Sequence, residues 1–205
     1  ALHYPVNITG LLIPYNPMRN ILKDKDQNKN LTPKEIEKAF GIWTPPFKSM
    51  KGMYNWLGLA PYPEASERGI FSVPYPGGGE TPPKFHMGAT ILNTPKGKGL
   101  TFSCATCHAH SLFGKSIMGL NNKRPRANEF FFRAKKAAPL VPSAAFKIAT
   151  GATKAETQQY VRSKKNLKAV GAILPLALGL DTSLPQVALS LSKRSADPYA
   201  TKSRY

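Results

Sequence analysis

The chain has 205 residues, 41% of them hydrophobic, which is enough for one domain with a real core and excludes a disordered chain. Its 29 Lys and Arg residues against 11 Asp and Glu residues give a net charge of +18, of which +16 falls on residues 81–205. Such a field attracts an acidic protein, an anionic membrane surface or nucleic acid. The most apolar run, residues 169–180, is broken by Pro175 and two glycines, so no segment supplies the roughly 18 to 20 residues of a membrane span.

The first segment with a chemical pattern is a polar loop between two short predicted helices, at residues 18–23 and 33–40. Counted as twelve positions, the loop has oxygen-bearing side chains at positions 1, 3, 5, 9 and 12, and position 7 supplies a backbone carbonyl. The candidate calcium ligands are Asp24, Asp26, Asn28, Asn30 (through its carbonyl), Thr32 and Glu35. This pattern resembles the EF-hand calcium loops, and the resemblance implies a bound calcium ion.

Two features weaken this loop as a calcium site. Lys29 stands at position 6, where the sharp turn favours glycine, because a side chain at positive φ costs about 1 kcal/mol. Flanking lysines also repel the ion, so the affinity is expected to be weak and suited to millimolar calcium. The alternative is a loop without calcium, in which Thr32 caps the helix that starts at Pro33 and Glu35 completes the cap.

Residues 42–98 are rich in proline and aromatic residues and include the run from Gly77 to Gly79. Clusters of Pro and Gly interrupt helices and strands. We therefore expect ordered irregular coil here, with Trp43, Trp56 and several tyrosines packed on a core or a cofactor. We expect an N-terminal extension over residues 1–97, which contains the calcium loop and this coil. Residues 98–205 are expected to form a second domain.

The two cysteines of the chain lie three positions apart, in Cys104-Ala105-Thr106-Cys107-His108. This is the C-x-x-C-H pattern of covalent haem attachment. Each thiol can form a thioether with one haem vinyl group, and the histidine that follows can bind the iron as the proximal ligand. A redox dithiol needs no such histidine, and a zinc site needs two further ligands where only His110 is near.

The segment from Cys104 to His108 resembles the haem-binding site of c-type cytochromes, and the similarity covers roughly residues 98–195. It implies a mainly α fold, with a cytochrome c-like haem domain after a long irregular extension that contains the EF-hand-like helix-loop-helix. More remotely, the Pro- and Tyr-rich segment before a haem motif resembles the N-terminal part of large bacterial di-haem cytochromes, which include peroxidases and rubber oxygenase-like enzymes. The sequence has no second C-x-x-C-H, so that likeness carries no enzymatic assignment.

In c-type cytochromes a glycine-containing loop follows the attachment helix, and a proline carbonyl accepts a hydrogen bond from the ligand histidine. The resemblance places Gly114, Gly119 and Pro125 in comparable positions. Such a contact orients the imidazole ring and tunes the iron. An ordinary loop proline is the alternative for Pro125.

Four helices are predicted from the haem motif onward. Capping and periodicity place them at Ser103 to Leu112, Asn128 to Ala137, Lys154 to Val170 and Leu184 to Leu191. In the second of these helices Asn128 is the expected N-cap, and Phe130 and Phe131 face inward. In the third, Thr153 and Glu156 form an expected capping box.

The second axial ligand of the iron decides what the haem does, and several residues are candidates. His86 and Met87 follow two prolines on the long coil and could fold over the distal side, and Met118 lies ten positions after His108. A vacant site, or one filled by a partner, is the other alternative. His110 lies too near the proximal ligand to reach the opposite face of the haem.

Electron transfer through one covalently bound haem c is the favoured function. The alternative is the haem domain of a peroxidase- or oxygenase-type enzyme with an open distal site, which needs acid-base groups above the iron, and acidic residues are few after Glu80. Nucleic-acid binding rests on charge alone and is disfavoured.

The expected partner is an acidic redox protein or another subunit of an electron-transfer assembly, steered by a basic edge after the motif. This edge consists of Lys123, Arg124, Arg126, Arg133, Lys135 and Lys136. Covalent haem attachment in bacteria takes place outside the cytoplasmic membrane, and the chain starts at Ala1 without a charged-then-apolar leader. A periplasmic or extracellular protein with its signal peptide removed is therefore expected.

Calcium should stabilise the chain through the loop from Asp24 to Glu35. At ten times its dissociation constant the ion adds about 1.4 kcal/mol, which raises Tm by a few degrees. Glu35→Gln should remove most of this shift because it alters the carboxylate that binds through two oxygens, whereas Glu37→Gln, just beyond the loop, should keep it. Melting curves with and without millimolar calcium measure the effect, and a Tm that ignores calcium contradicts the site.

Overall fold

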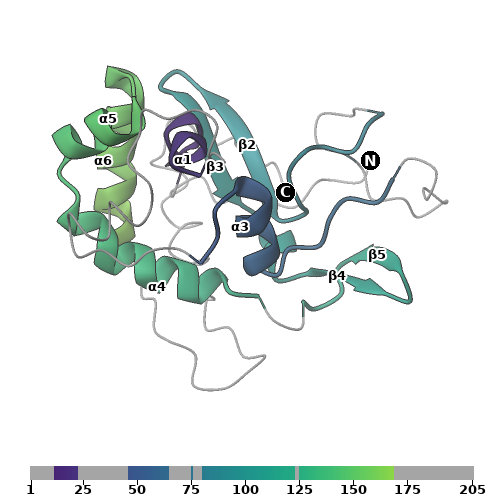
Figure 1. Cartoon of the computed structure of the whole chain (residues 1–205). Coiled ribbons are helices and arrows are strands. Elements are labelled where there is room, and N and C mark those ends of the chain that lie inside the picture. The colour runs from purple at the N-terminus through teal and green to yellow at the C-terminus, as the bar shows by residue number, and fades with distance from the viewer. Residues whose placement is uncertain (1–11, 23–45, 65–74, 76–79, 123–124, 169–205) are drawn as a thin grey trace, which may run out of the picture.

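The computed structural model describes residues 12–22, 46–64, 75, 80–122 and 125–168 (Figure 1). The predicted calcium loop, residues 24–35, lies outside these ranges, as do the predicted helices at 33–40 and 184–191. None of the helices within the described ranges is long and apolar enough to cross a membrane.

A three-stranded antiparallel sheet has the strand order β1-β3-β2. Its strands are β1 (Ile13–Pro14), β2 (Ala89–Thr94) and β3 (Gly97–Phe102). β2 and β3 form a hairpin in which Thr94 pairs with Gly97. Thr94 Oγ1 accepts a hydrogen bond from Lys96 N at 3.1 Å and donates one to Gly97 O at 2.7 Å. One side chain therefore satisfies two backbone groups of the turn.

The sheet contributes to the main hydrophobic core, together with helices α3 (Met50–Trp56) and α4 (Ala127–Ala137). Leu100 and Phe102 of β3 are almost fully buried in this core. Phe102 makes edge contacts with Phe130 and Phe131 of α4, with ring centroids 5.7 and 6.1 Å apart. Such contacts add to the free energy gained by burial, so the two phenylalanines hold α4 on the sheet.

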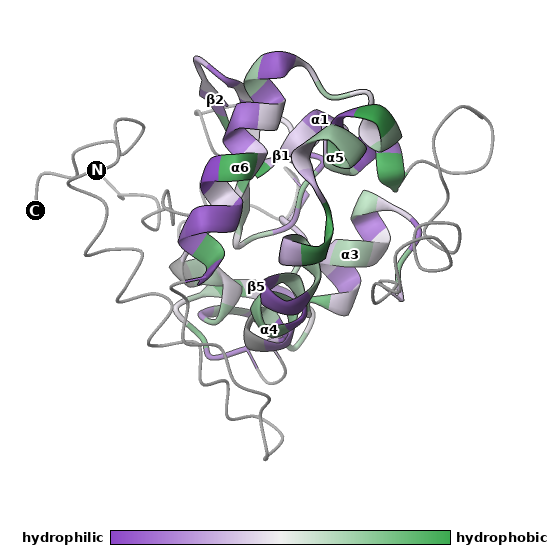
Figure 2. Ribbon diagram, turned by 90° about the vertical axis from the view of Figure 1, so that its left-hand side faces the viewer, coloured by the Kyte–Doolittle hydropathy of each residue, from purple (hydrophilic) through white to green (hydrophobic). Residues whose placement is uncertain are grey.

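Three further helices pack together (Figure 2): α1 (Tyr15–Ile21), α5 (Ser143–Thr150) and α6 (Lys154–Lys168). α5 ends at Gly151, whose φ of 65° gives a left-handed cap that suits glycine. Phe146 of α5 and Tyr160 of α6 stack with centroids 4.0 Å apart. Burial raises the pKa of Tyr160 to about 12. Its hydroxyl lies within hydrogen-bond distance of the carbonyls of Ala138, in the 3₁₀ turn η4 (Ala138–Leu140), and of Val141.

Polar contacts fix the N-terminal end of α6, a helix that is mostly hydrophilic (Figure 2). Glu156 Oε2 accepts hydrogen bonds from Thr153 N and Thr153 Oγ1, and Thr153 Oγ1 accepts one from Glu156 N. This confirms the predicted capping box. Glu156 Oε1 also accepts a hydrogen bond from Asn16 Nδ2 at 3.1 Å, so the buried carboxylate ties α6 to α1.

A separate two-stranded hairpin extends from the body of the molecule (Figure 1). It pairs β4 (Ala109–Leu112) with β5 (Lys115–Met118), and its two-residue turn is Phe113-Gly114. Both turn residues have positive φ, 50° at Phe113 and 74° at Gly114. A left-handed conformation costs a residue with a side chain roughly 1–2 kcal/mol, so the turn is strained at Phe113.

The prediction of a mainly α fold is wrong, because the described residues contain two antiparallel sheets beside five α-helices. β2 and α3 both lie within residues 42–98, which the Pro and Gly content predicts to be coil. Strand pairing with β3 and burial in the core decide the structure there, and local composition reports neither. The predicted division between residues 97 and 98 falls within β3, after its first residue, so both predicted parts supply strands to one sheet.

The helix predictions fare better where capping and periodicity agree. α4 confirms the helix at 128–137, and α6 confirms the helix from residue 154 to 168, where the described range ends. The expected N-cap role of Asn128 is wrong, because Arg126 occupies the N-cap position. α1 spans Tyr15–Ile21 where a helix at 18–23 is predicted, and α5 has no counterpart among the predictions.

Replacing the carboxylate that joins α1 and α6 should destabilise the fold. Glu156→Ala removes the capping box and leaves Asn16 Nδ2 without this acceptor, so we expect the free energy of unfolding to fall by about 2 kcal/mol. Urea denaturation measures the change. Gln158→Ala on the exposed side of the same helix is the matched control and should stay within about 0.5 kcal/mol of wild type; equal effects of the two variants would contradict the role of Glu156.

Candidate functional site

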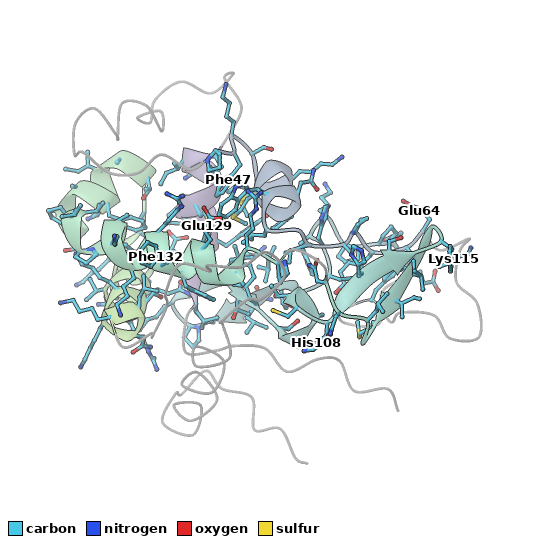
Figure 3. The ribbon with its side chains drawn as sticks, turned by 90° about the horizontal axis from the view of Figure 1, so that it is seen from below. Phe47, Glu64, His108, Lys115, Glu129 and Phe132 are labelled. Carbon is cyan, nitrogen blue, oxygen red and sulfur yellow. The ribbon has the colours of Figure 1, made fainter. Side chains whose placement is uncertain are left out.

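The C-x-x-C-H segment forms a single 3₁₀ turn, η3 (Cys104–Thr106), followed directly by β4. The predicted helix from Ser103 to Leu112 is therefore wrong. The cause is a pairing partner. β5 begins after a two-residue turn and pairs with β4, so the chain after His108 is extended rather than helical. The turn presents its residues at the base of the hairpin, and His108 lies at the edge of the molecule in Figure 3.

Asn122 fixes the motif from one side through two hydrogen bonds and joins it to Gly58 through a third. Its backbone N–H donates to Cys107 O at 2.8 Å, and its side-chain Nδ2 donates to Thr106 O at 3.2 Å and to Gly58 O at 2.6 Å. Gly58 follows the C-terminal end of α3, so Asn122, which is 8% exposed, connects the motif with that helix. Gly119 N donates to His108 O at 2.7 Å and closes the base of the hairpin.

Gly88 fixes the motif from another side. Its carbonyl accepts hydrogen bonds from Ser103 N and from Thr106 Oγ1, both at 2.9 Å. A Cβ atom at position 88 would lie 2.5 Å from Thr106 N and 2.6 Å from Thr106 Cα, and the φ of Gly88 is +89°. Only glycine permits this approach of two backbones, so the segment before β2 and the haem motif form one packed unit.

The motif residues differ sharply in exposure. Ala105 and Ala109 are 2% and 1% exposed, whereas Cys107 is half-buried and His108 is exposed. The small residues of the motif thus face the protein, and the histidine faces outward. The side chain of Cys104 lies outside what the structure describes.

Ala105 and Ala109 belong to a second hydrophobic cluster, here called the motif cluster. Its buried members are Ala60, Tyr62, Tyr75, Met87, Ala105 and Ala109, and Phe85 and Met118 pack against it. Two of the predicted distal ligands, Met87 and Met118, are therefore brought together beneath the motif. Met87 is fully buried there, whereas His108 is exposed at the surface.

The third distal candidate, His86, lies one residue before Met87 and is half-buried. Its Nδ1 donates a hydrogen bond to Leu59 O at 3.0 Å, and its ring lies 5.4 Å from that of Tyr54. Burial lowers the pKa of His86, and Lys51 adds to this shift against the opposing effect of the Leu59 hydrogen bond. A neutral ring that donates from Nδ1 carries its lone pair on Nε2, the form in which histidine binds iron. Burial and the nearby Tyr15 raise the pKa of Tyr54.

The predicted basic edge is partly engaged within the protein. Arg133 pairs with Glu129 at 2.8 Å, and Lys136 lies over the ring of Phe132 at 4.5 Å. The guanidinium of Arg126 lies 5.4 Å from the centre of the Trp56 ring. Lys135 is half-buried in the last turn of α4, and Lys123 and Arg124 fall outside the described residues.

Pro125 is half-buried and precedes the start of α4. The neighbouring Arg126 N donates to Leu57 O at 3.1 Å, which ties this point of the chain to the end of α3. A hydrogen bond between the Pro125 carbonyl and His108 stays a prediction.

The described residues hold no group of three or more His, Cys, Asp or Glu side chains that could bind a metal ion on its own. The predicted calcium ligands, from Asp24 to Glu35, lie outside these residues. No protein-family model matches the chain, and comparison with curated proteins and with solved structures likewise gives no match.

The sequence predictions do not include Gly88 and Asn122, which position the motif. Both act through backbone groups of residues far away in the sequence, up to 64 positions for the bond from Asn122 to Gly58. Glycine next to a predicted ligand is a weak signal that two backbones meet, and the Asn pair after Leu120 is a weak signal of a turn. Neither identifies its partner.

Removing the Asn122 side chain should loosen the motif and lower stability. Asn122→Ala deprives Thr106 O and Gly58 O of a buried donor, so we expect the free energy of unfolding to fall by about 2–3 kcal/mol. Hydrogen exchange of the amides from 105 to 109 should quicken in the same variant. The adjacent Asn121 is exposed, and Asn121→Ala should change neither quantity; a loss shared by both variants would contradict the positioning role.

Proposed function

We propose that this protein transfers electrons through one haem c, attached to Cys104 and Cys107 and ligated by His108. The observation that supports the proposal is the presentation of the C-x-x-C-H segment: its backbone is fixed on the inner side by Gly88 and Asn122, and His108 is exposed on the outer side. A rigid turn with an outward histidine suits a group that must be held in one orientation.

The residues around the motif fit a haem. Tyr62 Oη, in the motif cluster, is buried and has no hydrogen-bond partner among the described residues. Haem propionates accept hydrogen bonds, so a haem at this turn would offer what a buried phenol needs. His86 supplies an Nε2 lone pair, and Met87 and Met118 supply thioether sulfurs, all near the turn.

Each residue of the motif would have its own task. Cys104 and Cys107 would hold the haem by thioether bonds, and His108 would bind the iron from one side. Bound haem would supply an iron that alternates between its ferric and ferrous states. Asn122 would keep the Cys107 carbonyl, and hence the backbone beside His108, in place while the charge of the site changes.

The candidates for the distal iron ligand are His86, Met87, Met118 and a residue of a partner. His86 has the tautomer and the half-buried position of a ligand, and it is not one of the buried members of the motif cluster. Met87 would have to leave a site in which it is fully buried, at a cost of about 2–3 kcal/mol. We therefore favour His86 over Met87 as the distal residue.

The wider setting follows from the same proposal. The net charge of +18 suits an acidic redox protein or an acidic subunit as the partner. Covalent attachment of haem and a calcium ion in the loop from Asp24 to Glu35 both suit a periplasmic or extracellular protein.

Haem should stay with the protein after denaturation and extraction with acidified organic solvent. Cys104→Ala together with Cys107→Ala should release it into the organic phase, because both thioethers are lost. His108→Ala should keep the covalent bond and change the visible spectrum, whereas His110→Ala, two residues further on, should change neither. Haem that leaves the wild-type chain would refute covalent attachment.

The spectrum of the reduced protein separates an electron carrier from an enzyme with an open iron. Carbon monoxide should leave the spectrum unchanged if both axial positions are filled, and His86→Ala should then make the iron reactive to carbon monoxide. Rapid binding by the wild-type protein would instead favour the peroxidase- or oxygenase-type alternative.

A further inference from the structure

The hairpin that follows His108 carries an apolar tip that the rest of the described chain leaves uncovered. Phe113 is 95% exposed, and its neighbours Leu112 and Ile117 are 41% and 38% exposed. A Cβ atom on Gly114 would meet no atom within 4 Å. Figures 1 and 3 show the hairpin reaching out from the body, with Lys115 at its far end.

Phe113 is a poor choice for this turn on structural grounds. A two-residue hairpin turn with both φ angles positive favours Asn or Asp followed by glycine. Gly114 meets this rule, but Phe113 adopts a φ of +50°, which disfavours a bulky side chain. The aromatic ring gains no burial in return. The aromatic side chain of Phe113 is thus held in solvent although its backbone conformation destabilises the turn. Strained residues of this kind are often found at binding sites.

The two faces of the hairpin carry different kinds of side chain. Ala109 and Met118 pair on the inner face and belong to or pack on the motif cluster, and Ser116 Oγ on the same face donates to Pro61 O at 3.3 Å. The outer face carries the pairs His110 with Ile117 and Leu112 with Lys115. An apolar centre with one lysine, Lys115, beside it therefore lies just beyond the residue that would bind the iron.

We propose that this hairpin tip, Leu112 to Lys115 with Ile117, is the docking contact for an acidic electron-transfer protein, with Phe113 as the anchor. The inference rests on the proposed function and names the place where the redox partner binds. The partner would present an apolar depression rimmed by carboxylates, because the tip offers one aromatic ring beside Lys115 and the chain carries +18. Small interfaces draw most of their affinity from one or two such anchors, and long-range charge sets the association rate.

A protein partner suits the tip better than an anionic bilayer. The segment with Glu64 runs beside the hairpin, since Ser116 contacts Pro61, and Figure 3 shows Glu64 at the same end of the molecule as Lys115. An anionic membrane would repel this exposed carboxylate and offers it no partner. A protein surface can place a donor opposite Glu64 and carboxylates opposite Lys115.

The test uses the full 205-residue chain and an acidic flavodoxin as the probe. Phe113→Asn removes the anchor and installs the residue that the turn favours, so it should raise Tm while it weakens flavodoxin binding by at least about fivefold. Biolayer interferometry at low ionic strength measures the binding. The matched control is Ile148→Asn, which removes an apolar side chain that is 82% exposed on α5 and should leave binding unchanged. Phe113→Trp should preserve it.

A second measurement is the rate of electron transfer to the haem. Reduction of the haem by flavodoxin hydroquinone should slow in Phe113→Asn by the same factor as binding, whereas reduction by ascorbate should not, because the small reductant needs no docking. Binding is measured without reference to haem, so a chain that proves to lack covalent haem would overturn the proposed function and leave the docking result standing.

Three outcomes would overturn the docking proposal. The first is wild-type binding to flavodoxin that is absent or indifferent to salt. The second is an equal loss in Phe113→Asn and Ile148→Asn, which would show that any exposed apolar residue contributes. The third is sedimentation of the chain with phosphatidylglycerol vesicles that Phe113→Asn abolishes while flavodoxin binding stays intact, which would assign the tip to a membrane surface.

Discussion

The close approach of Gly88 to Thr106 is the contact on which the arrangement of the site depends. At this point the chain before β2 touches the chain after β3 without any side chain between them. The hydrogen bonds from Ser103 and Thr106 to the Gly88 carbonyl then extend the β2–β3 pairing beyond the sheet. The C-x-x-C-H segment thereby continues the sheet and is not a free loop. Its geometry depends on the hydrophobic core that holds β3 in place.

This construction differs from the helix that the motif resemblance implies. A helix would satisfy the motif's backbone groups within the segment itself. In this chain the groups are satisfied from outside, by Asn122, Gly119 and Gly88. The orientation of the motif therefore depends on two other segments, the one at Gly88 and the one from Gly119 to Asn122.

The sequence predicts those features that local chemistry decides. The capping box of Thr153 and Glu156 needs only residues three positions apart, and the apolar face of α4 repeats within one helix; both are confirmed. The strands are missed because they depend on pairing across the chain, as when Ile13 meets Leu100. For the site, spacing makes Cys104, Cys107 and His108 the candidates, and tertiary packing alone decides that Met87 lies beneath the motif and that Asn122 fixes it. The haem itself stays a prediction from the motif.

The shortness of β1 has a consequence for how copies of this protein can associate. β1 forms one edge of the three-stranded sheet, contains only Ile13 and Pro14, and its proline has no N–H group to offer. An incoming strand would find too few backbone groups there to form a stable ladder. Among the described residues, the β1 edge therefore offers little to a second chain. At the opposite edge, the six residues of β2 need another form of protection against edge-to-edge aggregation.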